Sequence, residues 1–316
     1  MKKLILSVGT AALGLLASFS VAQADWAPNG PIKLLIAFAA GGGADTQSRM
    51  IATAMEEKYG WEVIPENVTG KGGLNTAVAL KDMPADGTAI GMIVTETLGY
   101  NAVAAGNPVS ESDFTGLSTT AGFQMGIVSK ADKGWSDFGD VIAAAKAGEE
   151  IRFGTMSPRL SDLAFLLGEA NGVEFNIVQV RGGRAVMDGV NANDMDLGFM
   201  AGIQAKGVQA GDLVNLASAL PGPLELSPDA PLMSDFGVDF TGDGFFALVA
   251  PAGLDADARD ALVAAIGDIA TDADGEVNAL LKKAFGGPTI IAGADLDAKF
   301  AEDAAAAGEL LSAVSE

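Results

Sequence analysis

Residues 31–45 have the sequence PIKLLIAFAAGGGAD, in which a short apolar run leads into a glycine-rich loop. The run is bounded by Pro and Gly and predicts a buried β-strand over 31–38. Residues 46–59 follow with a helical pattern, whose shared apolar face consists of Met50, Ile51, Ala54 and Met55. The order strand, loop, helix is the unit from which a parallel sheet covered by helices is built.

The same order recurs along the chain in two runs, the first before residue 126 and the second in the middle of the chain. Further strands are predicted at 61–65, 88–95, 126–129, 151–155, 174–180, 195–200, 245–250 and 289–292. Further helices are predicted at 74–81, 135–147, 161–171, 185–191, 255–271, 275–285 and from Leu296 onward. Two runs of this alternation predict an α/β protein with two domains.

The amino-terminal segment has the pattern of a secretion signal. Lys2 and Lys3 precede an apolar run over 4–21, and 22–24 is Ala-Gln-Ala, a small-x-small cleavage site. We expect a signal peptide over 1–24, a mature chain that starts at Asp25, and export to the periplasm. The alternative, a membrane anchor, fits the cleavage site less well. Because the chain has no Cys, we expect a free rather than a lipid-anchored protein.

The absence of two residue types excludes several kinds of chemistry. The sequence contains neither His nor Cys, which removes the commonest general base, metal ligand and thiol nucleophile. We therefore expect no metal, no cofactor and no enzymatic activity. A secreted hydrolase using Ser157 or Ser161 with a lysine remains the alternative, although no S-x-x-K or G-x-S-x-G motif supports it.

The formal net charge of −22 also restricts the partners. Such a chain does not bind nucleic acid through phosphate contacts and is repelled by anionic membrane surfaces. A strongly acidic protein that binds an anion needs positive potential at the site itself.

The loop from Phe38 to Asp45 is the first candidate binding site. It lies at the carboxyl end of a strand and opens a helix, where open α/β sheets bind ligands and helix N–H groups attract anions. The alternative is a plain connection with Asp45 as the helix N-cap. A second glycine-rich loop, 70–73, does not match a P-loop, and we expect its Lys71 to be solvated.

Two loops of the middle block carry arginine at strand ends, over 155–159 and 181–184. Arginine binds a carboxylate through two parallel hydrogen bonds, so Arg159 or Arg184 is expected to neutralise an anionic ligand. The alternative is that these arginines are exposed or pair with acidic side chains.

An ordered set of motifs resembles one family over essentially the whole mature chain. The motifs are PIKLLIAFAAGGGAD, ENVTGKGG, ADGTAIGM, NPVSESDFTGL, IRFGT, VRGGRAVMDGVNANDMDLGF and FALVAPAGL. Together they resemble the receptor subunits of tripartite tricarboxylate transporters, the Bug family. The resemblance implies a monomeric two-lobed periplasmic-binding-protein fold, in which each lobe is a mainly parallel sheet flanked by helices, with the ligand cleft between them. It also implies that a small organic acid is captured and passed to membrane subunits; a receptor for another transporter class is the alternative.

Carried over to this chain, the resemblance gives lobe 1 as 25–125 plus 245–316 and lobe 2 as 126–244. The candidate ligand-binding residues of lobe 1 are Phe38, Ala39, Ala40, Gly41, Gly42, Gly43, Asp45, Thr95 and Thr97. Those of lobe 2 are Thr155, Met156, Ser157, Arg159, Arg181, Gly182, Gly183, Arg184, Met200 and Ala201.

The second lobe departs from the family pattern in two places. The family loop is usually richer in Gly and Ser and is followed by a His, whereas this chain has Met156, Pro158 and Arg159 there and Asp162 near the usual His. Val180 stands where an aromatic residue is common. These changes indicate a ligand unlike the commonest ones of the family.

We predict that Gly42→Val abolishes ligand binding while the protein stays folded. A side chain in the loop would block the close approach of the backbone to an anion. The measurement is ligand affinity together with the circular dichroism spectrum, with Gly30→Val as the control outside the loop. Normal affinity of the Gly42 variant would remove this loop from the site.

Overall fold

The structure is a computed structural model that describes residues 26–315. The expected signal peptide and the cleavage before Asp25 lie outside the described residues. Within 26–315, no helix combines the length and the apolar character needed to cross a membrane.

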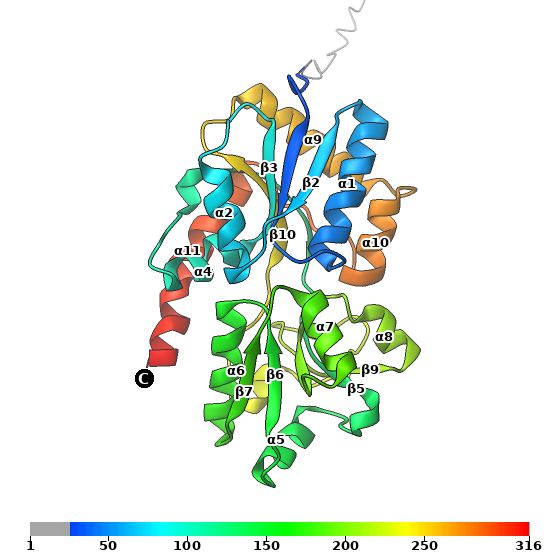
Figure 1. The fold of residues 1–316 in the computed structure, drawn as a ribbon, viewed down its shortest axis with the longest axis vertical. Coiled ribbons are helices and arrows are strands. Elements are labelled where there is room, and N and C mark those ends of the chain that lie inside the picture. The colour runs from blue at the N-terminus through cyan, green and yellow to red at the C-terminus, as the bar shows by residue number, and fades with distance from the viewer. Residues whose placement is uncertain (1–25, 316) are drawn as a thin grey trace, which may run out of the picture.

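Lobe 1, the upper half in Figure 1, is a five-stranded sheet flanked by helices. Its strands are β1 (Ile32–Ile36), β2 (Val63–Asn67), β3 (Ala89–Val94), β4 (Phe114–Gly122) and β10 (Phe245–Pro251). Its helices are α1 (Gly43–Tyr59), α2 (Leu74–Lys81), α3 (Thr95–Leu98), α4 (Tyr100–Ala104), α9 (Ala256–Thr271), α10 (Glu276–Phe285) and α11 (Ala294–Ser315), with 3-10 turns at Lys71–Gly73 and Glu111–Asp113. The order is β2-β1-β3-β10-β4; β1 is parallel to β2 and β3, and β10 is antiparallel to both of its neighbours.

Lobe 2 repeats this plan with the middle of the chain. Its strands are β5 (Gly126–Lys130), β6 (Ile151–Thr155), β7 (Phe175–Gln179), β8 (Leu197–Met200) and β9 (Leu213–Ser218). Its helices are α5 (Phe138–Lys146), α6 (Pro158–Asn171), α7 (Gly183–Ala192) and α8 (Ala205–Ala210), with 3-10 turns at Ala131–Lys133 and Met233–Phe236. The order is β7-β6-β8-β5-β9, with β6 parallel to β7 and β8 and β5 antiparallel to β8 and β9. Each sheet has two parallel and two antiparallel strand pairs, so the sheets are mixed rather than mainly parallel, because β10 and β5 run opposite to their neighbours. The two-lobed α/β fold is confirmed.

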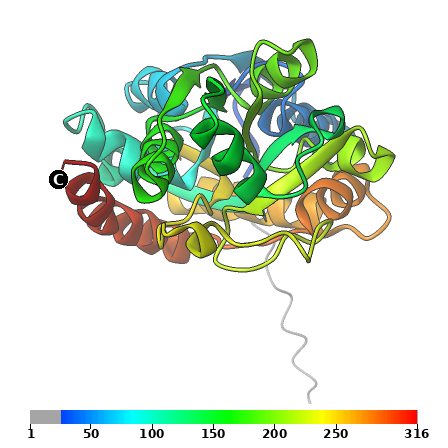
Figure 2. The same ribbon diagram turned by 90° about the horizontal axis from the view of Figure 1, so that it is seen from below.

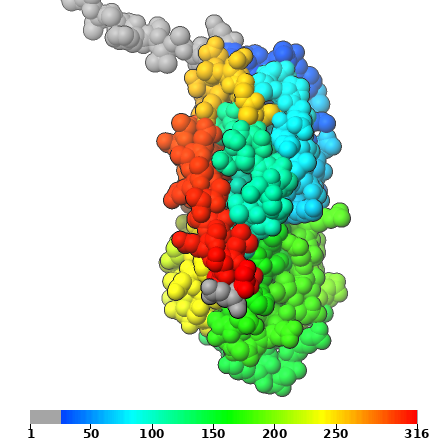
Figure 3. Space-filling view, turned by 90° about the vertical axis from the view of Figure 1, so that its left-hand side faces the viewer, coloured from blue at the N-terminus to red at the C-terminus, as the bar shows by residue number. Residues whose placement is uncertain are grey.

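The chain passes between the lobes twice, at 123–125 and near 244. The two passages are tied together, because the Phe123 N–H donates to the Gly244 carbonyl oxygen at 2.9 Å. Helix α11 adds a third link: it runs down the side of lobe 1, and its end contacts α6 of lobe 2 (Figures 1 and 3). The segment between β9 and β10, yellow in Figure 2, passes beside α11, where 239–241 line a groove together with Asp303.

Several helices begin earlier than the sequence predicts. Helices α1, α6 and α7 start at Gly43, Pro158 and Gly183, within segments predicted as loops. Pro fits the first helical position because it needs no hydrogen-bond partner for its nitrogen. The N-cap of α1 is Gly42, so the alternative prediction of Asp45 as N-cap is wrong.

Two strands were missed and one predicted strand is absent. Strands β4 and β9 were not predicted, since β4 is rich in Ser, Thr and Gly rather than in apolar residues. Residues 289–292 run along β4 through main-chain hydrogen bonds of Thr289 and Ile291 and one isolated bridge, but form no regular strand.

We predict that Phe153→Ala destabilises the protein by about 3–5 kcal/mol. Phe153 of β6 is fully buried and contacts the rings of Phe138, Phe175 and Phe199 at the centre of lobe 2, so its removal leaves a cavity. Urea unfolding followed by circular dichroism measures the effect. Phe165→Ala is the control, because that ring is 42% exposed; equal losses for both variants would contradict the prediction.

Candidate functional site

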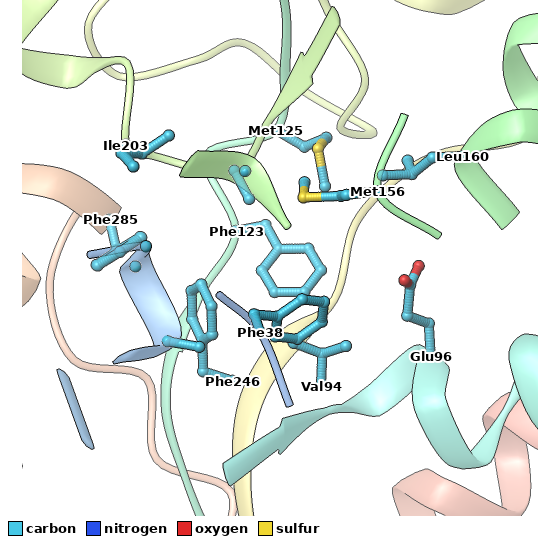
Figure 4. Close-up of a pocket in the computed structure, with 15 residues that line it drawn as sticks. Phe38, Val94, Glu96, Phe123, Met125, Met156, Leu160, Ile203, Phe246 and Phe285 are labelled. Carbon is cyan, nitrogen blue, oxygen red and sulfur yellow. The ribbon is translucent and has the colours of Figure 1, made fainter. Parts of the chain in front are cut away.

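A cavity between the lobes lies where the carboxyl ends of the parallel strands meet. It contains about 510 Å³ of space between atoms, part of it open to solvent, of which about 40 Å³ admits the centre of a water molecule. The lining residues come from both lobes: Phe38, Gly42, Gly43, Ala44, Val94, Glu96, Phe123, Met125, Met156, Leu160, Gly183, Ala201, Ile203, Phe246 and Phe285 (Figure 4). Of these described residues, Glu96 alone has a polar side chain, so the walls are otherwise apolar, as is usual for small-molecule sites.

Lobe 1 presents the amino terminus of α1 to this cavity. The Gly43 and Ala44 N–H groups belong to the first turn, and no acceptor for either occurs within 26–315. A Cβ atom on Gly43 would lie 3.0 Å from the Phe285 ring, and one on Gly42 would lie 3.2 Å from the Ala39 carbonyl oxygen. Glycine at these positions therefore lets the backbone itself form the wall of the cavity.

Buried polar contacts hold the loop before α1 in place. Asp45 accepts from the Gly41 N–H at 2.9 Å and from Arg49 at 2.9 Å. Although burial raises the pKa of Asp45, the hydrogen bonds from Arg49 and Gly41 outweigh it and hold the pKa below its usual value. Asn67 donates to the Phe38 carbonyl oxygen and to Asp45, each at 2.9 Å. Asp45 thus positions the loop and does not line the cavity.

Lobe 2 presents the amino terminus of α7 to the same cavity. Gly183 opens the helix, and its N–H has no recorded acceptor in the described chain. The preceding Gly182 has φ +117°, which only glycine adopts readily, and a Cβ atom there would lie 3.2 Å from Phe38 of lobe 1. The cavity is therefore bordered by two helix amino termini, one from each lobe, and such termini favour an anion.

The lobes are closed on each other in this structure. The Ala39 N–H of lobe 1 donates to the Arg181 carbonyl oxygen of lobe 2 at 3.1 Å. The Tyr100 hydroxyl donates across the cleft to Asp162, and burial raises the pKa of that carboxyl above its usual value. Asp162, which lies near the position of the usual family His, thus forms a contact between the two lobes.

Glu96 is the one polar lining residue of the described chain that was not among the predicted ligand-binding residues, although its neighbours Thr95 and Thr97 were. The apolar lining residues that were not predicted are Ala44, Val94, Phe123, Met125, Leu160, Ile203, Phe246 and Phe285. Glu96 follows β3 and is 4% exposed; its Oε1 accepts from Asn101 at 3.3 Å, whereas its Oε2 has no hydrogen-bond partner among the described residues. Burial raises the pKa of Glu96 above its usual value; Arg159, 4.0 Å away, and the Ser157 hydroxyl and Asn101 amide oppose this without reversing it.

The hydroxyl groups predicted as ligands have partners within the protein. Thr95 accepts from the Phe245 N–H at 3.2 Å, and Thr97 donates to the Gly72 carbonyl oxygen at 2.9 Å. Thr155 shares a hydrogen bond with Ser161, and Ser157 accepts from the Leu160 N–H as the N-cap of α6. These groups stabilise the strand ends and helix starts around the cavity.

The three arginines have different surroundings. Arg159 donates to the carbonyl oxygens of Thr241 at 2.7 Å and Asp243 at 2.9 Å, so its guanidinium braces the second passage between the lobes. Arg181 is exposed and contributes its carbonyl oxygen. Arg184 donates only its Nε to Asp188, and its Nη1 lies 3.9 Å from the Cβ position of Gly41. Arg184 is thus the arginine that lies beside the glycine-rich loop of lobe 1.

The predicted site residues divide into two groups. Those that line the cavity are Phe38, Gly42, Gly43, Met156, Gly183 and Ala201. Those that lie around it are Ala39, Ala40, Gly41, Asp45, Thr95, Thr97, Thr155, Ser157, Arg159, Arg181, Gly182, Arg184 and Met200. Lys71, predicted to be solvated, is exposed. No cluster of three or more acidic side chains that could hold a metal ion occurs in residues 26–315.

We predict that Glu96→Gln stabilises the ligand-free protein near pH 8 and loses this advantage near pH 4. A raised pKa means that the folded state holds a proton that the unfolded state releases above about 4.5, so wild-type stability falls as the pH rises above that value. Gln stays neutral and does not suffer this loss. Melting temperatures across this pH range test it, with the exposed Glu57→Gln as control. A lower melting temperature for Glu96→Gln near pH 8 would contradict the prediction.

Known proteins are similar to this chain in sequence and in fold. The family model "Tripartite tricarboxylate transporter family receptor" matches residues 47–309. A Cupriavidus necator relative, the "UPF0065 protein in gbd 5'region", is 28% identical over 259 residues, covering 79% of this chain and 77% of the relative. The periplasmic binding protein BugD has a TM-score of 0.79 at 20% identity, covering 92% of this chain and 99% of BugD. MatC from Rhodopseudomonas palustris, solved with bound malate, has a TM-score of 0.77 at 18% identity, covering 90% and 99%. The chain belongs to the receptor family of the tripartite tricarboxylate transporters, the family of solute-binding proteins to which its motifs pointed.

Proposed function

We propose that this protein is a periplasmic receptor that captures a small organic carboxylate and delivers it to the membrane subunits of a tripartite tricarboxylate-type transporter. The observation that carries the proposal is the pair of helix amino termini, α1 from lobe 1 and α7 from lobe 2, at one apolar cavity. Membership of the receptor family supports it, as does the malate bound by MatC, a protein of the same fold.

The carboxylate would be held by main-chain N–H groups. Hydrogen bonds to a charged group contribute about 1.5–3 kcal/mol each, whereas a helix dipole contributes about 0.3–1 kcal/mol. The direct hydrogen bonds from Gly43, Ala44 and Gly183 therefore dominate, and the dipoles assist. Arg184, beside the glycine-rich loop of lobe 1, adds the local positive charge that a chain of net charge −22 needs to admit an anion.

Ligand binding would also hold the lobes together. A carboxylate that accepts from α1 and α7 at once has this full set of contacts only in the closed arrangement, so it shifts the population toward closure. We propose that 25–125 with 245–316 and 126–244 move as two bodies, with the passages at 123–125 and 244 as hinges.

A binding role also accounts for the serines of the hydrolase alternative better than catalysis does. The Ser157 hydroxyl caps α6 and the Ser161 hydroxyl contacts Thr155. No hydrogen bond from a lysine to either hydroxyl occurs in the part of the chain that the structure describes. We therefore propose a receptor without enzymatic activity, exported by a signal peptide that is removed before Asp25.

We predict that at least one small carboxylate raises the melting temperature by several degrees at a concentration about 100 times its Kd, because a ligand that binds only the folded state stabilises it by about 2.7 kcal/mol. A panel of mono-, di- and tricarboxylates tests this, with chloride at equal ionic strength as control. The same ligand should reduce the radius of gyration measured by solution scattering. A panel without any shift would overturn the carboxylate assignment.

A further inference from the structure

The cavity has a hydrogen-bond acceptor that the binding of a carboxylate does not explain. Glu96 lines the cavity, and its buried Oε2 atom makes no hydrogen bond to residues 26–315, although the Ser157 hydroxyl lies near this carboxylate. Arg159 is the nearest cation, but its Nη1 lies 4.0 Å from Oε2, beyond hydrogen-bond distance, and bonds to the carbonyl oxygens of Thr241 and Asp243 hold its guanidinium there. A buried acceptor without a donor costs free energy that a ligand N–H group would recover.

Glu96 lies at the opposite side of the cavity from the amino terminus of α1. In Figure 4, Glu96 and Phe285 are on opposite sides, with the rings of Phe38, Phe123 and Phe246 between them. Gly43 packs against Phe285, so the N–H donors of α1 are on the side away from Glu96. The cavity thus has a donor end, an apolar middle and an acceptor end.

We propose that the ligand is a small organic acid with a nitrogen N–H donor, an ammonium or amide group, at the end opposite its carboxylate. This inference rests on the proposed function and specifies its substrate class. The carboxylate lies at the starts of α1 and α7, the apolar body contacts Phe38 and Phe123, and the nitrogen donates to Glu96. A second carboxylate at that end would lie beside Glu96, where both carboxyl groups can be ionised together only at a cost in free energy.

The pKa of Glu96 is consistent with this placement. Burial raises the pKa of Glu96, because Arg159, Ser157 and Asn101 do not fully compensate its negative charge. An ammonium or amide N–H placed against Oε2 would favour the ionised carboxylate and lower that pKa again. Binding of an ammonium ligand would therefore release protons at mildly acidic pH.

Matched ligands of equal length test the proposal on the wild-type protein. From 4-aminobutanoate to 6-aminohexanoate, each amino acid is compared by calorimetry with its amide-acid, its dicarboxylate and its unsubstituted monocarboxylate. We expect the nitrogen-bearing acid of the best length to bind about tenfold to a hundredfold more tightly than the dicarboxylate of that length.

Glu96→Gln separates the contact between Glu96 and the ligand nitrogen from binding of the carboxylate. The substitution should weaken the nitrogen-bearing acid by about tenfold or more and strengthen the dicarboxylate, since the repelling charge is gone. Asp243→Asn is the control: it removes another carboxylate that contacts Arg159, at 3.4 Å, but lies outside the cavity lining. Asp243→Asn should leave the preference for the nitrogen-bearing acid over the dicarboxylate unchanged. If this preference falls as much as in Glu96→Gln, the effect comes from Arg159 and the proposal is overturned.

Two further outcomes distinguish the inference from the function on which it rests. If the dicarboxylate binds the wild type as tightly as the nitrogen-bearing acid and Glu96→Gln does not change their ratio, the inference is wrong and the carboxylate receptor stands. If no member of any series binds, the proposed function fails and the inference fails with it.

Discussion

The first-turn N–H groups of α1 and α7 are the constraint on which the site depends. A helix leaves these groups without internal partners, and an apolar wall offers them no acceptor. In this protein they border one cavity from opposite lobes. An anionic ligand that satisfies both sets at once also joins the lobes, so binding and closure follow from the same hydrogen bonds.

Glycine at the start of each helix makes this arrangement possible. Gly43 allows the backbone to pack against Phe285, and Gly182 allows lobe 2 to approach Phe38. The polar side chains around the cavity are mostly occupied with each other, as Asp45 is with Arg49 and the Gly41 N–H. The backbone is thereby held rigid, and the ligand meets main-chain donors whose positions are fixed before it arrives.

Electrostatics act locally here rather than through the whole protein. The net charge of −22 opposes any anion at long range, but salt screens this field beyond about 8–10 Å. Inside the cavity, the nearby N–H donors determine whether an anion binds. With Glu96 at one side and the start of α1 at the other, the proposed ligand has its donor at the first and its negative charge at the second.

The sequence by itself determined the α/β class, the family and the loops that border the cavity. These features are local: apolar runs followed by glycine-rich loops set strands, turns and helix starts, and carboxyl ends of parallel strands meet at one edge. Which side chain of a loop faces the cavity was decided only by tertiary structure. Thr97 is taken by Gly72 and Arg159 by Thr241, a residue 82 positions away, whereas Glu96 between two threonines is left beside the cavity. No sequence pattern records such distant partners, because they become neighbours only when each lobe folds.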